Sequence, residues 1–276
     1  LHHLRSELGD EAFFRAIGRY VASHRGGSVE TVDLRRAVEA ETGRNVDAFF
    51  SQWVESPGHP EFSVRHAFDP LRRRLTLTVK QTQNRADGAP LFAAHVRCKV
   101  WFAKGELERT FEVTGAEHRF HWELPEDPVG VRFASDGAPL FVIDFERPEG
   151  FLITQLERDD DLFGRVEAAE ALAAQRTPAG VAALAKAFRK EARWTHAVEF
   201  ATYLGRTRAP AAREALVHGT THALPRIRAA AATALGRFRE PAAAEALQKL
   251  LAGEKHPLVR AAALRGLGRT REASGL

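Results

Sequence analysis

A leucine followed by a small residue recurs at a nearly constant interval through the C-terminal part of the chain. Leu172, Leu204, Leu235 and Leu267 lie 32, 31 and 32 residues apart, and Pro178, Pro210 and Pro241 each follow six residues after a leucine. A period of this length is typical of repeats made of two helices joined by a turn. One such pair cannot bury its own apolar face, so the sequence predicts that the pairs stack into an α-helical solenoid over residues 149–276.

Arginines keep the same register. Arg165, Arg228 and Arg260 each precede a repeat leucine by seven residues, and Ala197 occupies the equivalent place in the remaining repeat. Such a row could bind a peptide carboxylate or a phosphate. It could equally join neighbouring repeats through their carboxylates or carbonyls, and we favour this structural interpretation.

Residues 59–148 follow a period of two instead. The segment from Leu75 to Gln81 alternates strictly between apolar and polar residues, as does that from His95 to Phe102. About seven such short segments, separated by turn residues, predict an antiparallel β-sandwich. Its expected core comprises Leu75, Leu77, Val79, Val96, Cys98 and Val100.

Residues 1–58 show the helical period. We expect one helix up to the break at Gly26, a second that Thr31 caps and Gly43 ends, and a third that begins after Asn45 and stops at Pro57. The predicted fold class is therefore multidomain α and β, with a short helical segment at 1–58, a sandwich at 59–148 and a solenoid at 149–276.

Two resemblances to known families arise from particular residues. The run from Ile227 to Gly236, and that from Val259 to Gly268, resemble HEAT repeats in the pattern Val/Ile-Arg-x-x-Ala followed by Leu-Gly. The segments LHHLRSELGDEAFF at 1–14 and TVDLRRAVEAETGRNVDAFFSQWVESPGHP at 31–60 resemble aminopeptidase N-like zinc peptidases of the gluzincin family, as does Gln81-Thr82-Gln83. In that family such helices close the catalytic domain, and a sandwich and a helical domain follow in many members.

The resemblance also shows what this sequence lacks. The family's zinc site is a His-Glu-x-x-His helix, whose histidines bind the metal while the glutamate activates water, and the sequence contains no such motif. His218 and His222 have the helical spacing but no glutamate between them. We therefore expect no catalytic, cofactor-binding or metal-binding residues here and the zinc to lie in the parent protein, with His3 the candidate for a supporting role near the parent's catalytic cleft.

The sequence thus predicts the C-terminal, non-catalytic portion of a zinc-dependent aminopeptidase, cut just after its catalytic residues. The parent would be a zinc metallo-aminopeptidase, and this chain alone is expected to be inactive. This part would shape and enclose substrate access, with the parent's catalytic part and a peptide substrate as partners. The alternative is a HEAT-repeat scaffold that binds proteins without enzymatic activity.

Composition and charge exclude several other classes of protein. With 44% hydrophobic and 28% charged residues the chain is globular, and no apolar run is long enough for a membrane span. A net charge of +4 is too small to indicate a nucleic-acid partner. The N-terminal residues lack the basic and apolar regions of a signal peptide, and we expect a cytoplasmic location.

Overall fold

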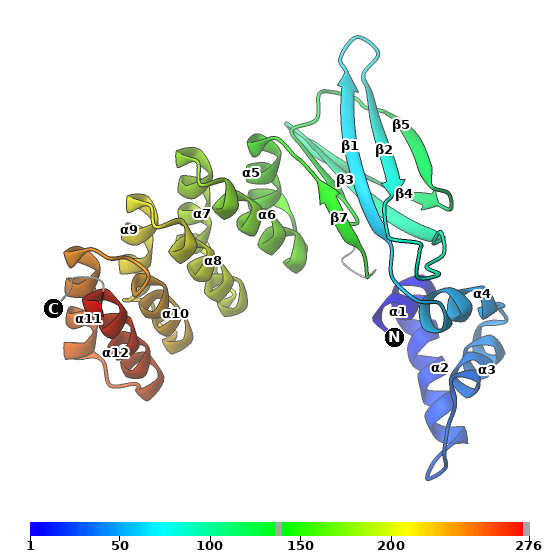
Figure 1. Cartoon of the computed structure of the whole chain (residues 1–276), viewed down its shortest axis with the longest axis horizontal. Helices are drawn as coiled ribbons and strands as arrows, with labels where there is room; N and C mark the ends of the chain where they lie inside the picture. Colours follow the sequence, from blue (N-terminus) through cyan, green and yellow to red (C-terminus); the bar gives the residue numbers. More distant parts are fainter. Residues whose placement is uncertain (136–139, 273–276) are drawn as a thin grey trace. The chain divides into compact units, whose positions relative to one another are not determined.

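The computed structural model describes residues 1–135 and 140–272, and the side chains of residues up to 270. Helices are followed by two β-sheets and then by a long run of helices (Figure 1), so the predicted fold class is confirmed. Residues 1–128 and 133–146 form one compact unit, and residues 129–132 and 147–276 form a second. The domain division at residues 58 and 148 stays a prediction.

The N-terminal segment forms α1 (His2–Leu8), α2 (Asp10–Ser23), α3 (Thr31–Thr42), α4 (Asp47–Phe50) and the π-helical turn η1 (Ser51–Glu55). The first predicted helix is split, because Gly9 adopts a φ of 78° that a helix cannot continue through. Glu30 rather than Thr31 is the N-cap of α3, and its amide donates to the Asp33 carboxylate over 2.9 Å. Gly43 ends α3 in a left-handed conformation, as predicted.

These helices bury a small core of their own. It contains Leu4, Phe13, Ala16, Val38, Val46 and Phe50. Among the contacts that join these helices to the sheet region of the first unit, two involve η1. The Gln52 amide exchanges two 2.7 Å hydrogen bonds with the backbone of Ala93, and the Trp53 ring lies 5.4 Å from that of Phe92.

Within residues 1–135 and 140–272, seven strands form two sheets. They are β1 (Glu61–Asp69), β2 (Arg74–Gln81), β3 (Ala94–Phe102), β4 (Gly105–Val113), β5 (Glu117–Glu123), β6 (Gly130–Phe133) and β7 (Val142–Phe145). The strand orders are β5-β2-β1-β7 and β4-β3-β6. The pairing of β7 with β1 is parallel, which the expectation of an antiparallel sandwich missed. The chain passes through the other sheet at β6 before it reaches this edge, so β7 does not have to reverse against β1.

The predicted sandwich core is confirmed. All six of its residues are at most 1% exposed, namely Leu75, Leu77, Val79, Val96, Cys98 and Val100. In the register of the first sheet Leu75 is opposite Phe68 and Trp122, and Leu77 is opposite His66 and Phe120. Alternation along β2 therefore places one face of that strand inside the unit.

The C-terminal helices are α5 (Glu149–Arg158), α6 (Leu162–Gln175), α7 (Pro178–Lys190), α8 (Trp194–Thr207), α9 (Pro210–Gly219), α10 (Pro225–Leu235), α11 (Pro241–Gly253) and α12 (Pro257–Glu272). The repeat prolines begin α7, α9 and α11, where the missing N–H needs no partner. Helices α6, α8, α10 and α12 pack in sequence, and α7 packs on α9 in a second layer. No helix of the described residues is both long and apolar enough to cross a bilayer.

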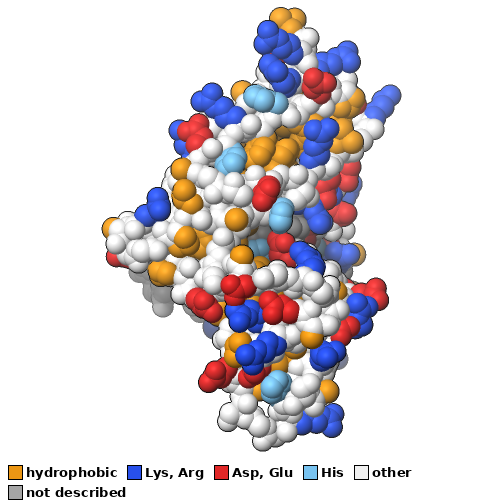
Figure 2. Space-filling model, turned by 90° about the vertical axis from the view of Figure 1, so that its right-hand side faces the viewer, with side chains coloured by type: hydrophobic (Ala, Val, Ile, Leu, Met, Phe, Trp, Pro, Cys, Tyr) orange, Lys and Arg blue, Asp and Glu red, His pale blue; other side chains and the backbone are white. Residues whose placement is uncertain are grey.

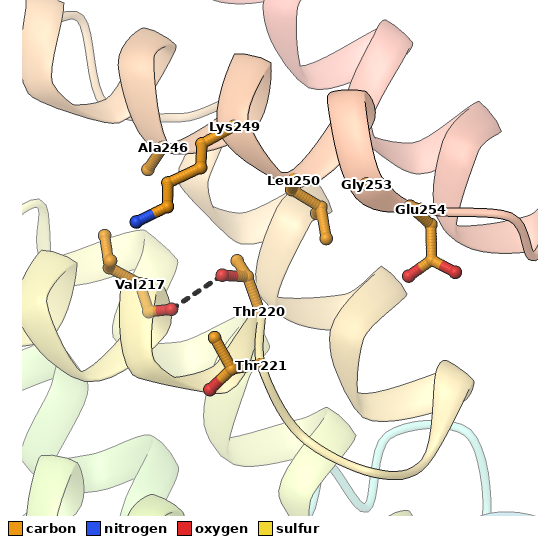
Figure 3. A pocket seen from close by; sticks show the side chains of 8 residues that line it. All are labelled: Val217, Thr220, Thr221, Ala246, Lys249, Leu250, Gly253 and Glu254. Carbon is orange, nitrogen blue, oxygen red and sulfur yellow. Dashed lines mark hydrogen bonds between the residues drawn. The ribbon is translucent and has the colours of Figure 1, made fainter.

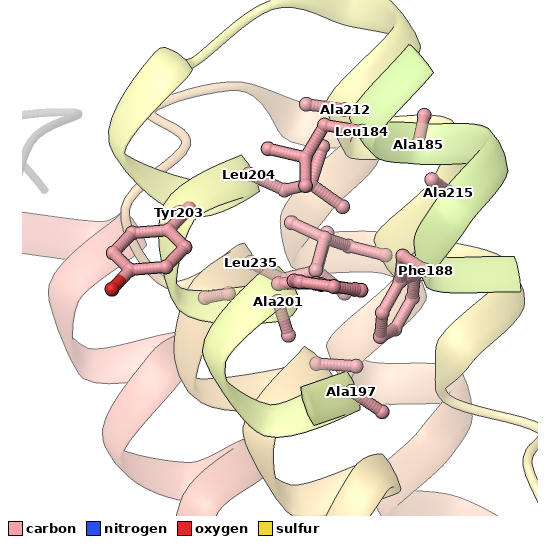
Figure 4. Close-up of a cluster of buried hydrophobic side chains, with 14 of the residues drawn as sticks. Leu184, Ala185, Phe188, Ala197, Ala201, Tyr203, Leu204, Ala212, Ala215 and Leu235 are labelled. Carbon is pink, nitrogen blue, oxygen red and sulfur yellow. The ribbon is translucent and has the colours of Figure 1, made fainter. Parts of the chain in front are cut away.

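One continuous apolar core runs through these helices. The repeat leucines Leu172, Leu204 and Leu235 are fully buried in it, and Leu267 is 8% exposed. Figure 4 shows part of this core, in which side chains such as Leu184, Leu204 and Ala215 point toward one another. Each repeat leucine therefore fills the space between two layers of helices, as the period predicts.

Glycines allow successive helices to approach closely. A Cβ added to Gly205 would lie 3.0 Å from the Cβ of Ala234, and one added to Gly236 would lie 2.6 Å from the Cα of Gly266. Gly268 occupies the same repeat position in α12, but no atom lies within 4 Å of its added Cβ. The small residue after the repeat leucine is therefore required by packing at Gly205 and Gly236.

This difference predicts opposite effects for two identical substitutions. Gly236→Ala should lower the free energy of unfolding by about 1–3 kcal/mol, because its methyl group meets the backbone of α12. Gly268→Ala, the matched control, should be neutral or stabilise by up to about 1 kcal/mol, since alanine is the better helix former. Urea denaturation of both variants measures this. Equal effects would show that α10 and α12 do not touch at Gly236.

Candidate functional site

The predicted arginine row lies between the helical repeats. The Arg165 guanidinium binds the Glu191 carboxylate over 2.6 Å, donates to the Leu156 carbonyl over 3.0 Å and lies over the Phe200 ring. Burial raises the pKa of Glu191, but the Arg193 amide and the charges of Arg165 and His196 outweigh it and leave that pKa below its ordinary value. Arg165 therefore joins α6 to the end of α7.

The second arginine makes the same contact with an additional hydrogen bond. Arg228 Nε and Nη2 donate to the two carboxylate oxygens of Glu254 over 2.6 and 3.1 Å, and Nη1 donates to the carbonyls of His222 and Ala223. The hydrogen bonds from Arg228 lower the pKa of Glu254 to about 2, with help from the amides of His256 and Lys255. Glu254 is thus a fixed anion at the end of α11.

The remaining positions of the row differ. Arg260 donates to the carbonyls of Leu251 and Glu254 over 3.4 and 2.9 Å. Glu191 and Glu254 follow Arg165 and Arg228 by 26 residues. In the remaining repeat, Ala197 replaces the arginine, and Ala223, which follows it by 26 residues, replaces the glutamate. The arginine and its partner are therefore absent together. These contacts are those that the structural interpretation expects, and a ligand-binding ladder stays a prediction.

A pocket of about 330 Å³ lies beside this row, between α9 and α11 (Figure 3). Its walls are Val217, Thr220, Thr221, Ala246, Lys249, Leu250, Gly253 and Glu254. The Thr220 hydroxyl donates to the Val217 carbonyl over 2.7 Å, and Glu254 is held by Arg228. The charged groups in its wall are therefore the Glu254 carboxylate, which is paired with Arg228, and the Lys249 amine.

His3, the supporting-role candidate, lies in the first unit among aromatic rings. Its ring is 4.3 Å from that of Trp53 and 5.3 Å from that of Phe49. Glu7 lies between two histidines, 3.6 Å from His3 Nε2 and 3.3 Å from His95 Nδ1. The hydrogen bond with His3 lowers the pKa of Glu7 against the opposing effect of burial. The structure thus places His3 in a histidine–carboxylate group, and its role toward a catalytic cleft stays a prediction.

One deeply buried ion pair, between Arg132 and two aspartates, was not predicted from the sequence. Arg132 is 2% exposed, and its Nη1 and Nη2 donate to Asp159 over 3.0 Å and Asp161 over 2.7 Å. Asp161 also caps α6 by accepting the Gly164 amide over 3.1 Å. The available signal was an arginine flanked by Val131 and Phe133 in an apolar strand, which requires a buried anionic partner.

The histidines with helical spacing do not form a pair of metal ligands in the described structure. Helix α9 ends at Gly219, so His218 and His222 do not share a helix face, and the His222 ring accepts the Leu224 amide over 3.0 Å. Within residues 1–135 and 140–272, no three histidine, cysteine or carboxylate side chains are grouped as metal ligands. The view of the molecule in Figure 2 shows acidic and basic side chains interspersed, so that face has no continuous basic surface.

Comparisons with known proteins agree with the helical repeats of the second unit. Residues 181–268 match HEAT repeats, and residues 164–190 match the PBS lyase HEAT-like repeat. Aminopeptidase N of Lactococcus lactis subsp. lactis is 35% identical over 71 residues, which are 26% of this chain and 8% of that protein. Tricorn protease-interacting factor F2 of Thermoplasma volcanium is 33% identical over 76 residues, or 28% of this chain and 10% of that protein.

The fold extends the likeness over nearly the whole chain. The crystal structure of Legionella pneumophila aminopeptidase A in complex with aspartic acid superposes with a TM-score of 0.73 at 15% identity, covering 99% of this chain and 39% of that one. The chain resembles the C-terminal region of aminopeptidase N-like peptidases. It ends in HEAT repeats. The matched segments make up 8% and 10% of the two relatives' lengths, so the chain corresponds to only a small part of each.

The ionised Glu254 makes stability depend on pH in a defined window. Its pKa is lowered in the folded state, so its contribution is fully present above about pH 4.5 and is lost as the pH falls toward 2. The Glu254→Gln variant should therefore have a lower free energy of unfolding than the unsubstituted chain at pH 7. This difference in free energy should shrink as the pH falls from 4.5 to 2. Urea denaturation across this range measures it, with the exposed Glu245→Gln as control. A difference that is constant with pH would contradict the assignment.

Proposed function

We propose that this chain is the non-catalytic C-terminal part of a zinc-dependent aminopeptidase, and that its helical repeats shape and enclose the path of the peptide substrate. The observation that supports this most directly is the order of its parts. Helices, sheets and helical repeats follow one another as in the aminopeptidase structure that superposes on 99% of the chain.

The residues of the chain suit a supporting role rather than a chemical one. A catalytic zinc needs three protein ligands and an open position for water, and the described residues offer no such set. Cys98 is fully buried in the sandwich, and the best-defined carboxylates, Glu254 and Asp159, are held by arginines. We therefore assign the metal, and the activation of water by it, to the parent's catalytic part.

What the chain would contribute is rigid surface. In the second unit, helices on a continuous core present their ends and loops at fixed positions, because each repeat is held by its neighbours. In the first unit, the aromatic group around His3 and Trp53 fixes α1 against the sheets. A catalytic part resting on α1 and α2 would thereby be held in one orientation.

The proposal predicts that the 276-residue chain binds no stoichiometric zinc and does not hydrolyse aminoacyl anilides. A longer protein that includes the upstream sequence should bind about one zinc and be active. Metal analysis and hydrolysis assays on both proteins test this. The control is the longer protein with the glutamate of its zinc motif replaced by glutamine. Zinc-dependent turnover by the 276-residue chain would contradict the proposal.

The role in substrate access needs a separate measurement. In the longer protein, removal of residues 147–276 should change the ratio of kcat/KM for an aminoacyl anilide to that for a decapeptide by about fivefold or more, because the repeats would contact long substrates only. Gly236→Ala, which perturbs packing but keeps every repeat, is the control. An unchanged ratio would contradict an access role.

A further inference from the structure

Large apolar side chains are exposed where three helices of the second unit begin. Trp194 at the start of α8, Leu224 before α10 and Leu258 at the start of α12 are 41%, 42% and 46% exposed. Together with Pro225, Arg226 and His256 they line a pocket of about 500 Å³. We call this surface, defined by these six residues, the Trp194 edge. Its walls are mostly apolar, and the pocket is large enough for a bulky side chain.

The same surface carries positive charge that the protein does not neutralise. The Arg226 guanidinium carbon lies 4.2 Å from the centre of the Trp194 ring. Arg226 and His256, and their neighbours Arg193 and Lys255, are exposed, and their side chains have no ion pair or hydrogen bond with any residue that the structure describes. The carboxylates nearest in sequence, Glu191 and Glu254, are bound to Arg165 and Arg228.

The helix ends add to this charge. Helices α8 and α10 both begin at the Trp194 edge, and neither has a side chain that caps its first amides. The first turn of a helix carries a partial positive charge and unsatisfied N–H groups, which favour an anion. An apolar pocket, an arginine stacked on tryptophan and unpaired basic side chains thus lie on one continuous surface.

We propose that the Trp194 edge binds an acidic peptide segment with one large apolar side chain. The apolar side chain would occupy the pocket between Trp194 and Leu258. Carboxylates of the segment would pair with Arg226, Arg193 and Lys255. Both the apolar pocket and the basic side chains would then contact the segment. A second copy of this chain is a poorer occupant, because two identical basic edges would face each other.

This proposal is independent of the proposed peptidase role, and it gives the scaffold alternative a definite surface. The probe is a fluorescein-labelled nonapeptide with four glutamates on each side of one phenylalanine, titrated with the full chain and followed by fluorescence anisotropy. We expect saturable binding that weakens as salt is added. Peptides with alanine for phenylalanine, or glutamine for every glutamate, should bind about tenfold or more weakly.

Two pairs of variants locate the binding. Arg226→Glu and Leu258→Ser should each weaken binding of the nonapeptide about tenfold or more. The matched controls are Arg237→Glu, beyond the other end of α10, and Leu264→Ser, an exposed leucine later in α12. They should stay within about twofold, and thermal unfolding checks that all four variants fold.

Several results would overturn the proposal. These are no binding of the nonapeptide, equal binding of the alanine peptide, or equal losses in the variants and their controls. Tighter binding of a single-stranded oligonucleotide that is lost in Arg226→Glu would assign the surface to nucleic acid instead. Self-association lost in Leu258→Ser would assign it to a second copy.

Discussion

Close approach between successive helices is the constraint on which the helical unit depends. Gly205 lies against Ala234 and Gly236 against Gly266, at distances where a further methyl group would meet backbone. Alanines such as Ala201, Ala215 and Ala231 fill much of the space between the helices and are fully buried. At this separation small side chains reach the packing density of a protein interior, and the repeat leucines close the space between the two layers.

The arrangement of the arginines follows from that packing. Apolar side chains fill the space between the helices, so Arg165 and Arg228 lie near the starts of α6 and α10 and join the carboxylates that end α7 and α11. Arg132 is the exception, since it is buried with Asp159 and Asp161 where the helical unit starts. Removal of one member of such a group leaves an uncompensated buried charge, which is more destabilising than loss of the whole group.

Features with a local period could be predicted from the sequence. The buried positions of β2 follow from alternation, and those of Leu172, Leu204 and Leu235 follow from the repeat. The split at Gly9 depends on the backbone conformation of a single residue, which a period does not reveal. The parallel pairing of β7 with β1 and the partners of Arg132 depend on residues far apart in the chain. The partners of Arg165 and Arg228 could have been predicted from the sequence, because Glu191 and Glu254 follow them by the same 26 residues. The Trp194 edge was not, because its residues come from three different repeats and only the stack brings them together.

The backbone contact at Gly236 and Gly266 also bears on how the stack responds to force. A shift of α12 along α10 that moves Gly266 away would place a residue with a side chain, such as Arg265 or Leu267, against a surface that accepts only hydrogen atoms. Sliding is therefore blocked by steric overlap, whereas separation of the two helices is opposed mainly by short-range dispersion and burial. Pulled from its C-terminal end, the stack should yield by peeling one helix at a time rather than by shear.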